Sequence, residues 1–480
     1  MYEERLNRAF SRITADSELK DRTLERIDNM NKKTMKRTRK AAGAVICAAA
    51  IGITTVFAAS PIGREAIGGI IDYFASDKAR EITSMEELSR HNEAIGESVS
   101  KNGITLTLDN VAADDNFVHV FYTVKLPEAF DTRTGYLNIE SIIDGEIGIS
   151  GNNNSHENYF ADDSAVKGVM KINVSTRSLP DKFKLELLMA YDETGNDIIS
   201  AQYMKNSNGE RAELSEDDKS GLLYISTDID KSAVSVESVV KEINKEISDR
   251  TEIEKIIFSP FGNQMVLRYD TRGLDEGGEA GSTVFNDNFA LFDENGTCLD
   301  VLNTDLMSVE NGIGRNSFEF LKADKNLKSI TFVPVKITPS YEDMPVIRQK
   351  TGAYPLTYET NKYGKVVVTG IRFKDGEILI DYYKDGYVMY DPGFVLENDA
   401  GENAEPGGKF NCILYTDVHY ETNSYTARYV YAPLDENGNV LPPDESVSAD
   451  KLEASLTTLG VVENKGVELD FDNAVILDID

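Results

Sequence analysis

The feature that most constrains this chain is an uninterrupted uncharged run, AAGAVICAAAIGITTVFAAS, from Ala41 to Ser60. A helix needs about 20 apolar residues to cross a bilayer, so the run has the length of one transmembrane span. The segment before it, KKTMKRTRK, is basic, and an excess of Lys and Arg marks the cytoplasmic side. Its orienting residues are Lys36, Arg37, Arg39 and Lys40. We expect a single-pass cell-membrane protein with a cytoplasmic N-terminus and an extracellular body.

Two other interpretations of this run remain open. In a cleaved signal peptide, Val56-Phe57-Ala58 would offer small residues at the positions that a signal peptidase reads, but the segment before the run is far longer than an ordinary n-region. The second alternative is a buried core helix, because the run is rich in Ala and Gly and only moderately apolar. The basic residues directly before the run and the polar start of the chain argue against that.

Charge is divided unevenly along the chain. Residues 1–40 hold twelve Lys/Arg and seven Asp/Glu, whereas the part after residue 60 holds 38 basic and 75 acidic residues, a balance of −37. An acidic body of this kind repels phosphate and anionic lipid, so direct nucleic-acid binding is disfavoured. With 41% apolar and 28% charged residues, the chain has the composition of folded protein with a polar surface.

The inner segment, residues 1–40, carries an apolar stripe at helical spacing. Forty residues cannot bury enough surface to fold firmly alone, so the stripe is explained either by a partner that completes its core or by a helix on the membrane surface. From the pattern alone these two explanations weigh equally. The candidate partner-binding residues are Leu6, Phe10, Ile13, Leu19, Leu24 and Ile27.

A second apolar stripe follows the run, in the juxtamembrane region 61–94. Pro61 ends the span, and the spacing after it predicts a short amphipathic helix at the outer membrane interface. A helix packed on the first outer domain is the alternative, and the pattern does not separate the two. The stripe consists of Ile62, Ala66, Ile67, Ile70, Ile71 and Phe74.

From about Lys101 the apolar period changes from helical to two, which predicts half-buried strands. We therefore expect a mainly β fold class, with N-terminal helices and one transmembrane helix followed by tandem β-sandwich domains. The expected domains are a cytoplasmic amphipathic helical segment at 1–40, the span at 41–60, a juxtamembrane helical region at 61–94, a first outer β domain at 95–235, a β-sandwich at 240–340 and a C-terminal β-sandwich at 360–480. The predicted strands include Gly103–Val111, Phe117–Leu126, Lys182–Ala190, Gln264–Gly273, Lys328–Ile337 and Thr426–Leu434.

A turn motif recurs at Tyr191–Asn196, Phe292–Thr297 and Leu434–Asn439, each with Asp followed by Gly three residues later. The order suits a tight hairpin, because Asp supplies an acceptor and Gly tolerates positive φ. Calcium is the alternative, but the motifs lack the alternating carboxylates of an EF-hand loop. We expect hairpin turns and no cofactor or metal.

Sequence motifs for catalysis are absent. Four histidines lie without metal-ligand spacing, and there is no nucleophile elbow, phosphate-binding loop or dinucleotide fingerprint. His119 lies on a predicted strand, where a hydrogen-bonded structural role is expected, and acidic pairs such as Asp114-Asp115 are expected to be solvated surface. Cys298 and Cys412 have the alternative of pairing across domains, but free buried thiols are the expected state. We expect no enzyme.

The order of parts resembles the single-pass anti-sigma-factor-like proteins of Gram-positive bacteria. The resemblance lies in the KRTRK-flanked span, in SPIGREAIGGIIDYF, and in EELSRHNEAIGESVSKNGITLTLDNVAADDNFVHVFYTVK. In that family the outer domain has no assigned function. The stretch from IEKIIFSPFGNQMVLRYD to LKSITFVPVKI resembles the immunoglobulin-like domain that commonly follows it.

The resemblance implies regulation of transcription. The inner segment would hold an extracytoplasmic-function sigma factor inactive, and the outer domains would sense an unknown extracellular ligand or stabilise the protein until proteolysis. The segment lacks the His and Cys ligands of zinc-containing anti-sigma domains, so inhibition would be metal-free. The alternative is a surface-displayed binding or adhesion protein with no regulatory role.

Overall fold

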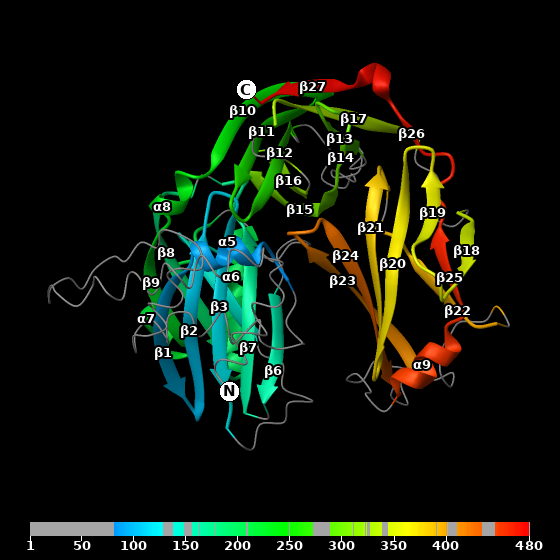
Figure 1. Cartoon of the computed structure of the whole chain (residues 1–480). Helices are drawn as coiled ribbons and strands as arrows, with labels where there is room; N and C mark the ends of the chain where they lie inside the picture. The colour runs from blue at the N-terminus through cyan, green and yellow to red at the C-terminus, as the bar shows by residue number, and fades with distance from the viewer. Residues whose placement is uncertain are drawn as a thin grey trace, which may run out of the picture. The chain divides into compact units, whose positions relative to one another are not determined.

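The computed structural model describes residues 81–127, 138–147, 156–162, 164–177, 179–207, 210–248, 250–270, 272, 289–310, 312–321, 323, 327–337, 344–389, 391–399, 401, 410–433 and 447–479. These residues are mainly β, as predicted (Figure 1). They fall into two compact units: residues up to 241 with 255–268 and 303–319, and residues 242–254, 269–302 and 320–480.

The first unit contains two antiparallel sheets. One has the strand order β1-β2-β3-β7-β6, with bounds β1 Glu93–Lys101, β2 Ile104–Ala113, β3 Phe117–Lys125, β6 His156–Asp162 and β7 Ala165–Asn173. The other has the order β5-β4-β8-β9, with bounds β4 Asn138–Ile143, β5 Glu146–Ile147, β8 Lys182–Ala190 and β9 Leu223–Asp230. Strands β2, β3 and β8 confirm three of the segments predicted from period-two alternation.

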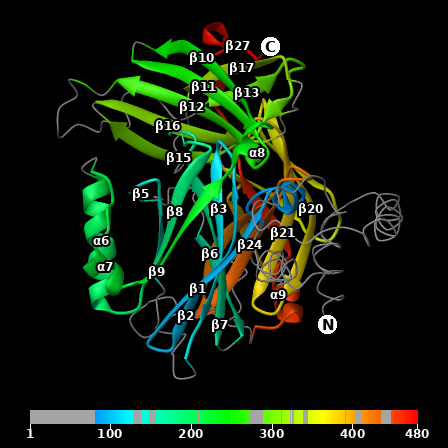
Figure 2. The same cartoon turned by 90° about the vertical axis from the view of Figure 1, so that its left-hand side faces the viewer.

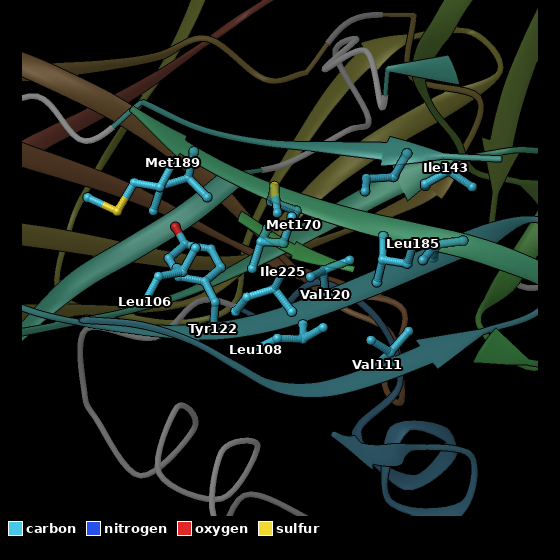
Figure 3. Packing of buried hydrophobic residues seen from close by; sticks show 14 of the residues in the cluster. Leu106, Leu108, Val111, Val120, Tyr122, Ile143, Met170, Leu185, Met189 and Ile225 are labelled. Atoms are coloured by element: carbon cyan, nitrogen blue, oxygen red, sulfur yellow. The ribbon is translucent and has the colours of Figure 1, made fainter. Parts of the chain in front are cut away.

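The core of this unit lies between the two sheets (Figure 3). Val120 and Tyr122 of β3 meet Leu185 and Met189 of β8 in one apolar cluster, and all four are essentially inaccessible to solvent. Gly168 pairs with Tyr122 across the strands, and a Cβ at residue 168 would collide with the tyrosine ring. The glycine therefore leaves the space in which the ring lies.

The helices among the described residues have between 3 and 15 residues. They are α5 Met85–Arg90, α6 Glu193–Ser207, α7 Glu216–Ser220, α8 Ser232–Ser235, α9 Ala449–Ser455 and the 3-10 helix η2 Phe471–Asn473. Figure 2 shows α6 and α7 on the side of the first unit where β5 and β8 lie. Ile199 of α6 packs there on Ile147 and Leu188, which extends the core beyond the second sheet.

The hairpin turn predicted at Tyr191–Asn196 is wrong, because α6 begins inside that motif. The Asp192 side chain accepts a hydrogen bond from the Gly195 amide at 3.0 Å, and the Asn196 amide donates to the Asp192 carbonyl at 3.2 Å. An aspartate that caps orphan amides starts a helix as readily as it starts a turn. The apolar residues that follow, which pack on β8, select the helix.

A third sheet has the strand order β10-β11-β12-β16-β15. Its bounds are β10 Val239–Ser248, β11 Thr251–Ser259, β12 Gly262–Asp270, β15 Val301–Glu310 and β16 Ile313–Phe320. Strand β12 confirms the predicted strand at Gln264–Gly273, ending slightly earlier. Residues 255–268 and 303–319 of this sheet belong to the first unit, so the turn between β11 and β12 lies in that unit.

The second unit contains three further groups of paired strands. The first has the order β14-β13-β17-β26, with β27 also on β17; its bounds are β13 Phe289–Asp293, β14 Cys298–Leu299, β17 Ser329–Ile337, β26 Glu468–Leu469 and β27 Val475–Asp478. The second is β18-β25-β22, with bounds β18 Val346–Lys350, β22 Phe394–Glu397 and β25 Thr458–Val462. The third is β19-β20-β21-β24-β23, with bounds β19 Leu356–Asn361, β20 Gly364–Lys374, β21 Glu377–Gly386, β23 Phe410–His419 and β24 Ser424–Pro433.

The turn predicted at Phe292–Thr297 is confirmed between β13 and β14. The Asp293 carboxylate accepts hydrogen bonds from the amides of Asn295 and Thr297 at 2.9 and 2.7 Å, and Gly296 has a φ of +81°. The third copy of the motif lies outside the described residues. Cys298, next to this turn, is a buried free thiol, as expected.

Tyrosines dominate the larger core of the second unit. Tyr358, Tyr382 and Tyr425 are almost completely buried, and the rings of Tyr382 and Tyr425 stack with centroids 5.1 Å apart. The Tyr425 hydroxyl donates to the Asp300 carboxylate at 2.9 Å, and the Tyr358 hydroxyl donates to the Leu459 carbonyl at 2.9 Å. Large rings whose hydroxyls are satisfied can be buried at little polar cost.

Candidate functional site

Helix α5 is the first element that the structure describes after the predicted span. Ser84 caps its N-terminus, where the side chain accepts a hydrogen bond from the Glu87 amide at 3.3 Å. The Asn92 side chain donates to the Leu88 carbonyl at 2.9 Å near the other end. A helix of six residues does not persist in water by itself, so its attachment to the β sheets must stabilise it.

The apolar side of this segment is buried in the first unit. Leu88 of α5 is completely inaccessible to solvent, and Ile82 just before the helix is 4% exposed. Both belong to a cluster with Phe117 and Phe121 of β3 and with Phe261 of the turn between β11 and β12. The alternate residues of β3 face the other core, so this sheet is covered on both faces.

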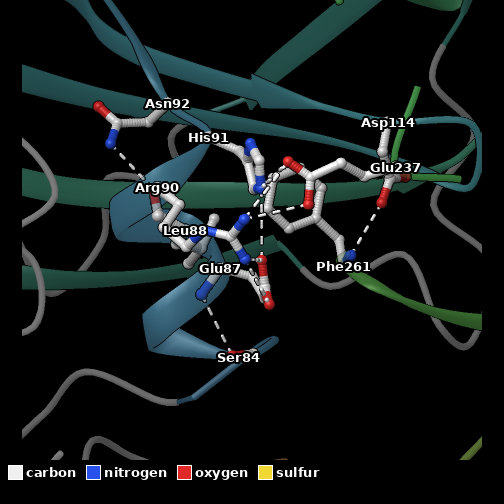
Figure 4. A network of polar contacts seen from close by, with 9 residues as sticks. All are labelled: Ser84, Glu87, Leu88, Arg90, His91, Asn92, Asp114, Glu237 and Phe261. Carbon is white, nitrogen blue, oxygen red and sulfur yellow. Dashed lines mark hydrogen bonds and ion pairs between the residues drawn. The ribbon is translucent and has the colours of Figure 1, made fainter. Parts of the chain in front are cut away.

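The polar side of α5 is held by charge (Figure 4). Arg90 binds Glu87 at 2.9 Å and Glu237, which follows α8, at 3.1 Å. The His91 Nε2 atom lies 3.4 Å from Glu87 and 3.6 Å from Glu237, with the side chain 6% exposed. The Thr83 hydroxyl donates to the Phe261 carbonyl at 2.7 Å. Partly exposed ion pairs each contribute less than about 1 kcal/mol, so the network fixes orientation more than it adds stability.

The turn that carries Phe261 is itself anchored on the first sheet. The buried Asp114 carboxylate accepts hydrogen bonds from the backbone amides of Asn116, Phe117 and Phe261, each at 2.8 Å. Burial raises the pKa of Asp114, and these amides partly offset the rise. The Asn116 side chain donates to the Gly262 carbonyl at 2.8 Å. The expectation that Asp114 is solvated surface is therefore wrong: its carboxylate organises a long-range junction.

A buried ion pair lies beside this turn. Lys171 of β7 and Glu319 of β16 are joined at 2.8 Å, and their side chains are only 3% and 2% exposed. The Lys171 ammonium also lies 4.2 Å from the centre of the Phe117 ring. Removing one member would leave an uncompensated buried charge, so each of the two side chains depends on the other.

His119 lies in the same layer, at 5.0 Å from the Phe261 ring and 6.0 Å from the Phe117 ring. Its ring is completely buried. Burial first, and then the positive charge of Lys171, lower the pKa of His119 well below its usual range; the Ala112 backbone acts in the opposite direction. His119 is therefore neutral at physiological pH.

The predicted partner-binding and topology-determining residues, from Leu6 to Lys40, lie outside the described residues, as does the predicted span. No helix in the part of the chain that the structure describes is long and apolar enough to span a bilayer. Within that same part, no group of His, Cys, Asp and Glu is arranged to hold a metal ion.

Helix α5 lies within the helical region predicted at 61–94, but its bounds and the junction around Asp114 and Phe261 were not predicted. One local signal for α5 was present: Ser84 followed by Glu87 is the spacing of a capping box. The junction has no comparable signal, because its partners are separated by 147 residues along the chain.

Comparison with known proteins gives a partial family match. A family model described as a domain of unknown function, DUF4179, matches residues 32–126. This agrees with the expected outer domain of unassigned function, and the match covers the basic segment, the predicted span, α5 and strands β1 to β3. No curated protein matches the chain.

Among solved structures, a conserved domain protein from Bacillus anthracis is similar to this chain. The two are 13% identical, over 56% of this chain and 82% of that one, with a TM-score of 0.32. A similarity at this score carries no argument about function.

Proposed function

We propose that this protein is a membrane-anchored anti-sigma factor. Residues 1–40 would bind an extracytoplasmic-function sigma factor in the cytoplasm, residues 41–60 would cross the membrane, and the β domains would lie outside the cell. In this proposal the strands between 240 and 340 form an immunoglobulin-like sandwich. The acidic balance of −37 after residue 60 suits a soluble exterior.

The observation that carries the proposal is the attachment of α5. The residues that hold α5 include Val234, Glu237 and Phe261, all well beyond the end of the matched family segment at residue 126. The described segment from Ile82 to His91 is therefore held by distant parts of the β body. A change of the body at these contacts would alter how that segment is held, which is what a sensor requires.

The inner segment supports the proposal through its size. Its six apolar residues would cover an apolar groove on the sigma factor, while the mixed charges between them set register. Forty residues without Cys or His contain no zinc site, so the partner itself must supply the missing core.

A binding experiment with a matched control tests the sigma-factor interaction. Phe10→Asp places a charge on the apolar stripe, whereas Ser11→Asp places the same charge on the opposite face of the predicted helix. We expect Phe10→Asp to weaken binding of an extracytoplasmic-function sigma factor from the same cell at least tenfold, and Ser11→Asp to change it less than threefold, measured by pull-down from detergent-solubilised full chain. If wild type retains no sigma factor, the proposal fails and surface display is favoured instead.

The proposed orientation has its own test. Replacing Lys36, Arg37, Arg39 and Lys40 together by Gln removes most of the positive charge next to the span. We expect a reporter fused after residue 95 to be outside the cell in the wild type and to appear inside in a substantial fraction of the variant. A reporter that stays inside in the wild type would contradict the orientation.

A further inference from the structure

One layer of the first unit buries a histidine beneath the turn between β11 and β12. His119 lies on β3 between Phe117 and Phe121, and strand residues two apart share a face, so all three point to the side on which Phe261 packs. The His119 ring meets the Phe261 ring at 5.0 Å, nearly perpendicular to it. Phe261 also meets the ring of His91, 6.2 Å away, at the end of α5. The turn therefore connects His119 to the α5 segment.

The position opposite His119 is occupied by a cation. In the antiparallel pairing of β3 with β7, His119 stands directly opposite Lys171. Side chains paired in this way lie on the same face of the sheet, with Cβ atoms about 5 Å apart, and like charges at such positions repel each other. Burial adds a cost for removing each charge from water. A proton on His119 would therefore place a second positive charge beside the first in a layer without solvent.

The carboxylates around this layer are already engaged. Asp114 accepts three backbone amides, and both oxygens of Glu319 accept hydrogen bonds from Lys171, at 2.9 and 2.8 Å. Residues 259–263 of the turn include no titratable side chain. A protonated His119 would therefore compete with existing partners for a counter-charge. The other ion pairs on the elements packed here join Lys231 to Asp115, and Arg90 and His91 to Glu87 and Glu237.

The turn fits closely against the layer. A Cβ at Gly262 would lie 2.8 Å from the Glu319 Oε1 atom and 3.0 Å from the Phe117 ring. The Asn116 side chain donates to the carbonyls of Ile257 and Gly262 at 3.2 and 2.8 Å, which fixes the turn from both ends. Because the turn backbone already touches its neighbours, a charged imidazole beneath it gains water only when the turn moves away.

We propose that His119 and residues 259–262 form an acid-sensitive latch, which opens when His119 takes up a proton. Opening hydrates the imidazolium and separates Phe261 from Ile82 and Leu88, so the α5 segment loses part of its attachment while the sheets stay folded. The proton is then the ligand of this layer, because it binds the open state better than the closed one. The inference does not depend on sigma-factor binding, because no residue before the predicted span takes part.

The size of the effect follows from linkage. Burial and the charge of Lys171 lower the pKa of His119 in the closed state, whereas in the open state it returns to about 6.5. Below that pH, opening therefore becomes more favourable as the pH falls, by up to about tenfold per pH unit. Asp114, whose pKa is raised by burial, acts in the opposite direction, and a comparison with a His119 variant cancels its contribution.

Hydrogen exchange of the detergent-solubilised full chain between pH 7.5 and 5.5 tests the latch, with rates corrected for the intrinsic effect of pH. The Phe261 and Leu88 amides report the latch, and the Leu185 amide on β8 reports unfolding of the sheets. We expect the first two to exchange roughly tenfold or more faster than Leu185 at every pH, through local opening. Their protection should fall about fivefold from pH 6.5 to 5.5.

Two variants assign the effect to one histidine. His119→Leu should remove the fall in protection of the Phe261 and Leu88 amides, whereas His91→Gln, which changes the other ring against Phe261, should retain it. Three results would overturn the inference: Phe261 and Leu88 exchanging as slowly as Leu185, protection that does not change with pH, or the same fall in His119→Leu. The first two need wild type alone, so they decide the matter even if His119→Leu does not fold.

Discussion

At the scale of single residues, the buried polar groups of the first unit determine how it responds to acid. His119 is neutral when folded because burial and Lys171 disfavour its charged form. In the unfolded chain its pKa returns to about 6.5. Between the lowered folded pKa and 6.5 the unfolded chain therefore binds more protons, and the free energy of unfolding falls as the pH falls.

We predict that His119→Leu removes this part of the acid sensitivity. Wild type should lose up to about 1.4 kcal/mol of stability per pH unit below pH 6.5 from this one group, and the variant should lose correspondingly less. Urea denaturation between pH 7.5 and 5 measures the difference. Val118→Ala, which truncates a buried apolar residue of the same strand and removes no titratable group, is the control and should keep the wild-type slope. Equal slopes in His119→Leu and wild type would contradict the assignment.

The comparison uses the difference between the pH slopes of variant and wild type, because Asp114 changes the free energy of unfolding with pH in the opposite direction to His119. The pKa of Asp114 is raised by burial, so the folded state binds a proton more readily than the unfolded chain above pH 3.8. Its contribution to stability therefore grows as the pH falls. Subtracting the two slopes cancels this term, since both proteins retain Asp114.

At the scale of elements, α5 shows how a short helix depends on its surroundings. Among the α5 residues whose burial the structure describes, Leu88 is the one with a completely buried apolar side chain. The cap at Ser84 contributes about 1 kcal/mol, which is less than the burial of one leucine. Detachment of α5 is therefore governed by the apolar contact and is oriented by the charges around Arg90.

We predict that Leu88→Ala lowers the stability of the first unit by about 2–4 kcal/mol, because it leaves a cavity under α5. Glu86→Ala, at an exposed position of the same helix, should change it by less than about 0.5 kcal/mol. Chemical denaturation of both variants, followed by hydrogen exchange of the Leu88 and His91 amides, makes the comparison. Similar losses in the two variants would show that α5 is not held through Leu88.

Strands were the elements that the sequence predicted best. The alternation in Phe117–Leu126 and Lys182–Ala190 reports directly which face is buried, and β3 and β8 lie where it placed them. The motif at residues 191–196 failed because an Asp that accepts amide hydrogen bonds fits a turn and a helix start equally well. The site around α5 depends on pairings between distant residues, and no local pattern encodes these.

At the scale of the whole molecule, the final strands are paired far from their position in the sequence. Strand β27 pairs with β17, with Asp478 opposite Ser329. Leu477 is 1% exposed, and the Ile479 amide donates to the Lys328 carbonyl at 2.8 Å. Strand β26 also pairs with β17, with Leu469 opposite Val335. These contacts join β26 and β27 to β17 within the second unit.

We predict that Leu477→Asp and Ile476→Asp, at adjacent positions of β27, differ sharply. Leu477→Asp buries a carboxylate without a partner and should cost the second unit about 3 kcal/mol or more. Ile476 is 70% exposed, so Ile476→Asp should cost less than about 1 kcal/mol. Hydrogen exchange of the β17 amides reports the loss locally. Unchanged exchange in Leu477→Asp would refute the role of β27.

The pairing of β27 with β17 also constrains when the second unit can finish folding. Nearly 150 residues separate Ser329 from Asp478, so a ribosome completes β17 long before it has made its neighbour. During that interval an edge of β17 lacks this partner, and open edges invite pairing with other chains. A nascent chain that stalls before β27 is made would keep that edge exposed, whereas synthesis of β27 covers it.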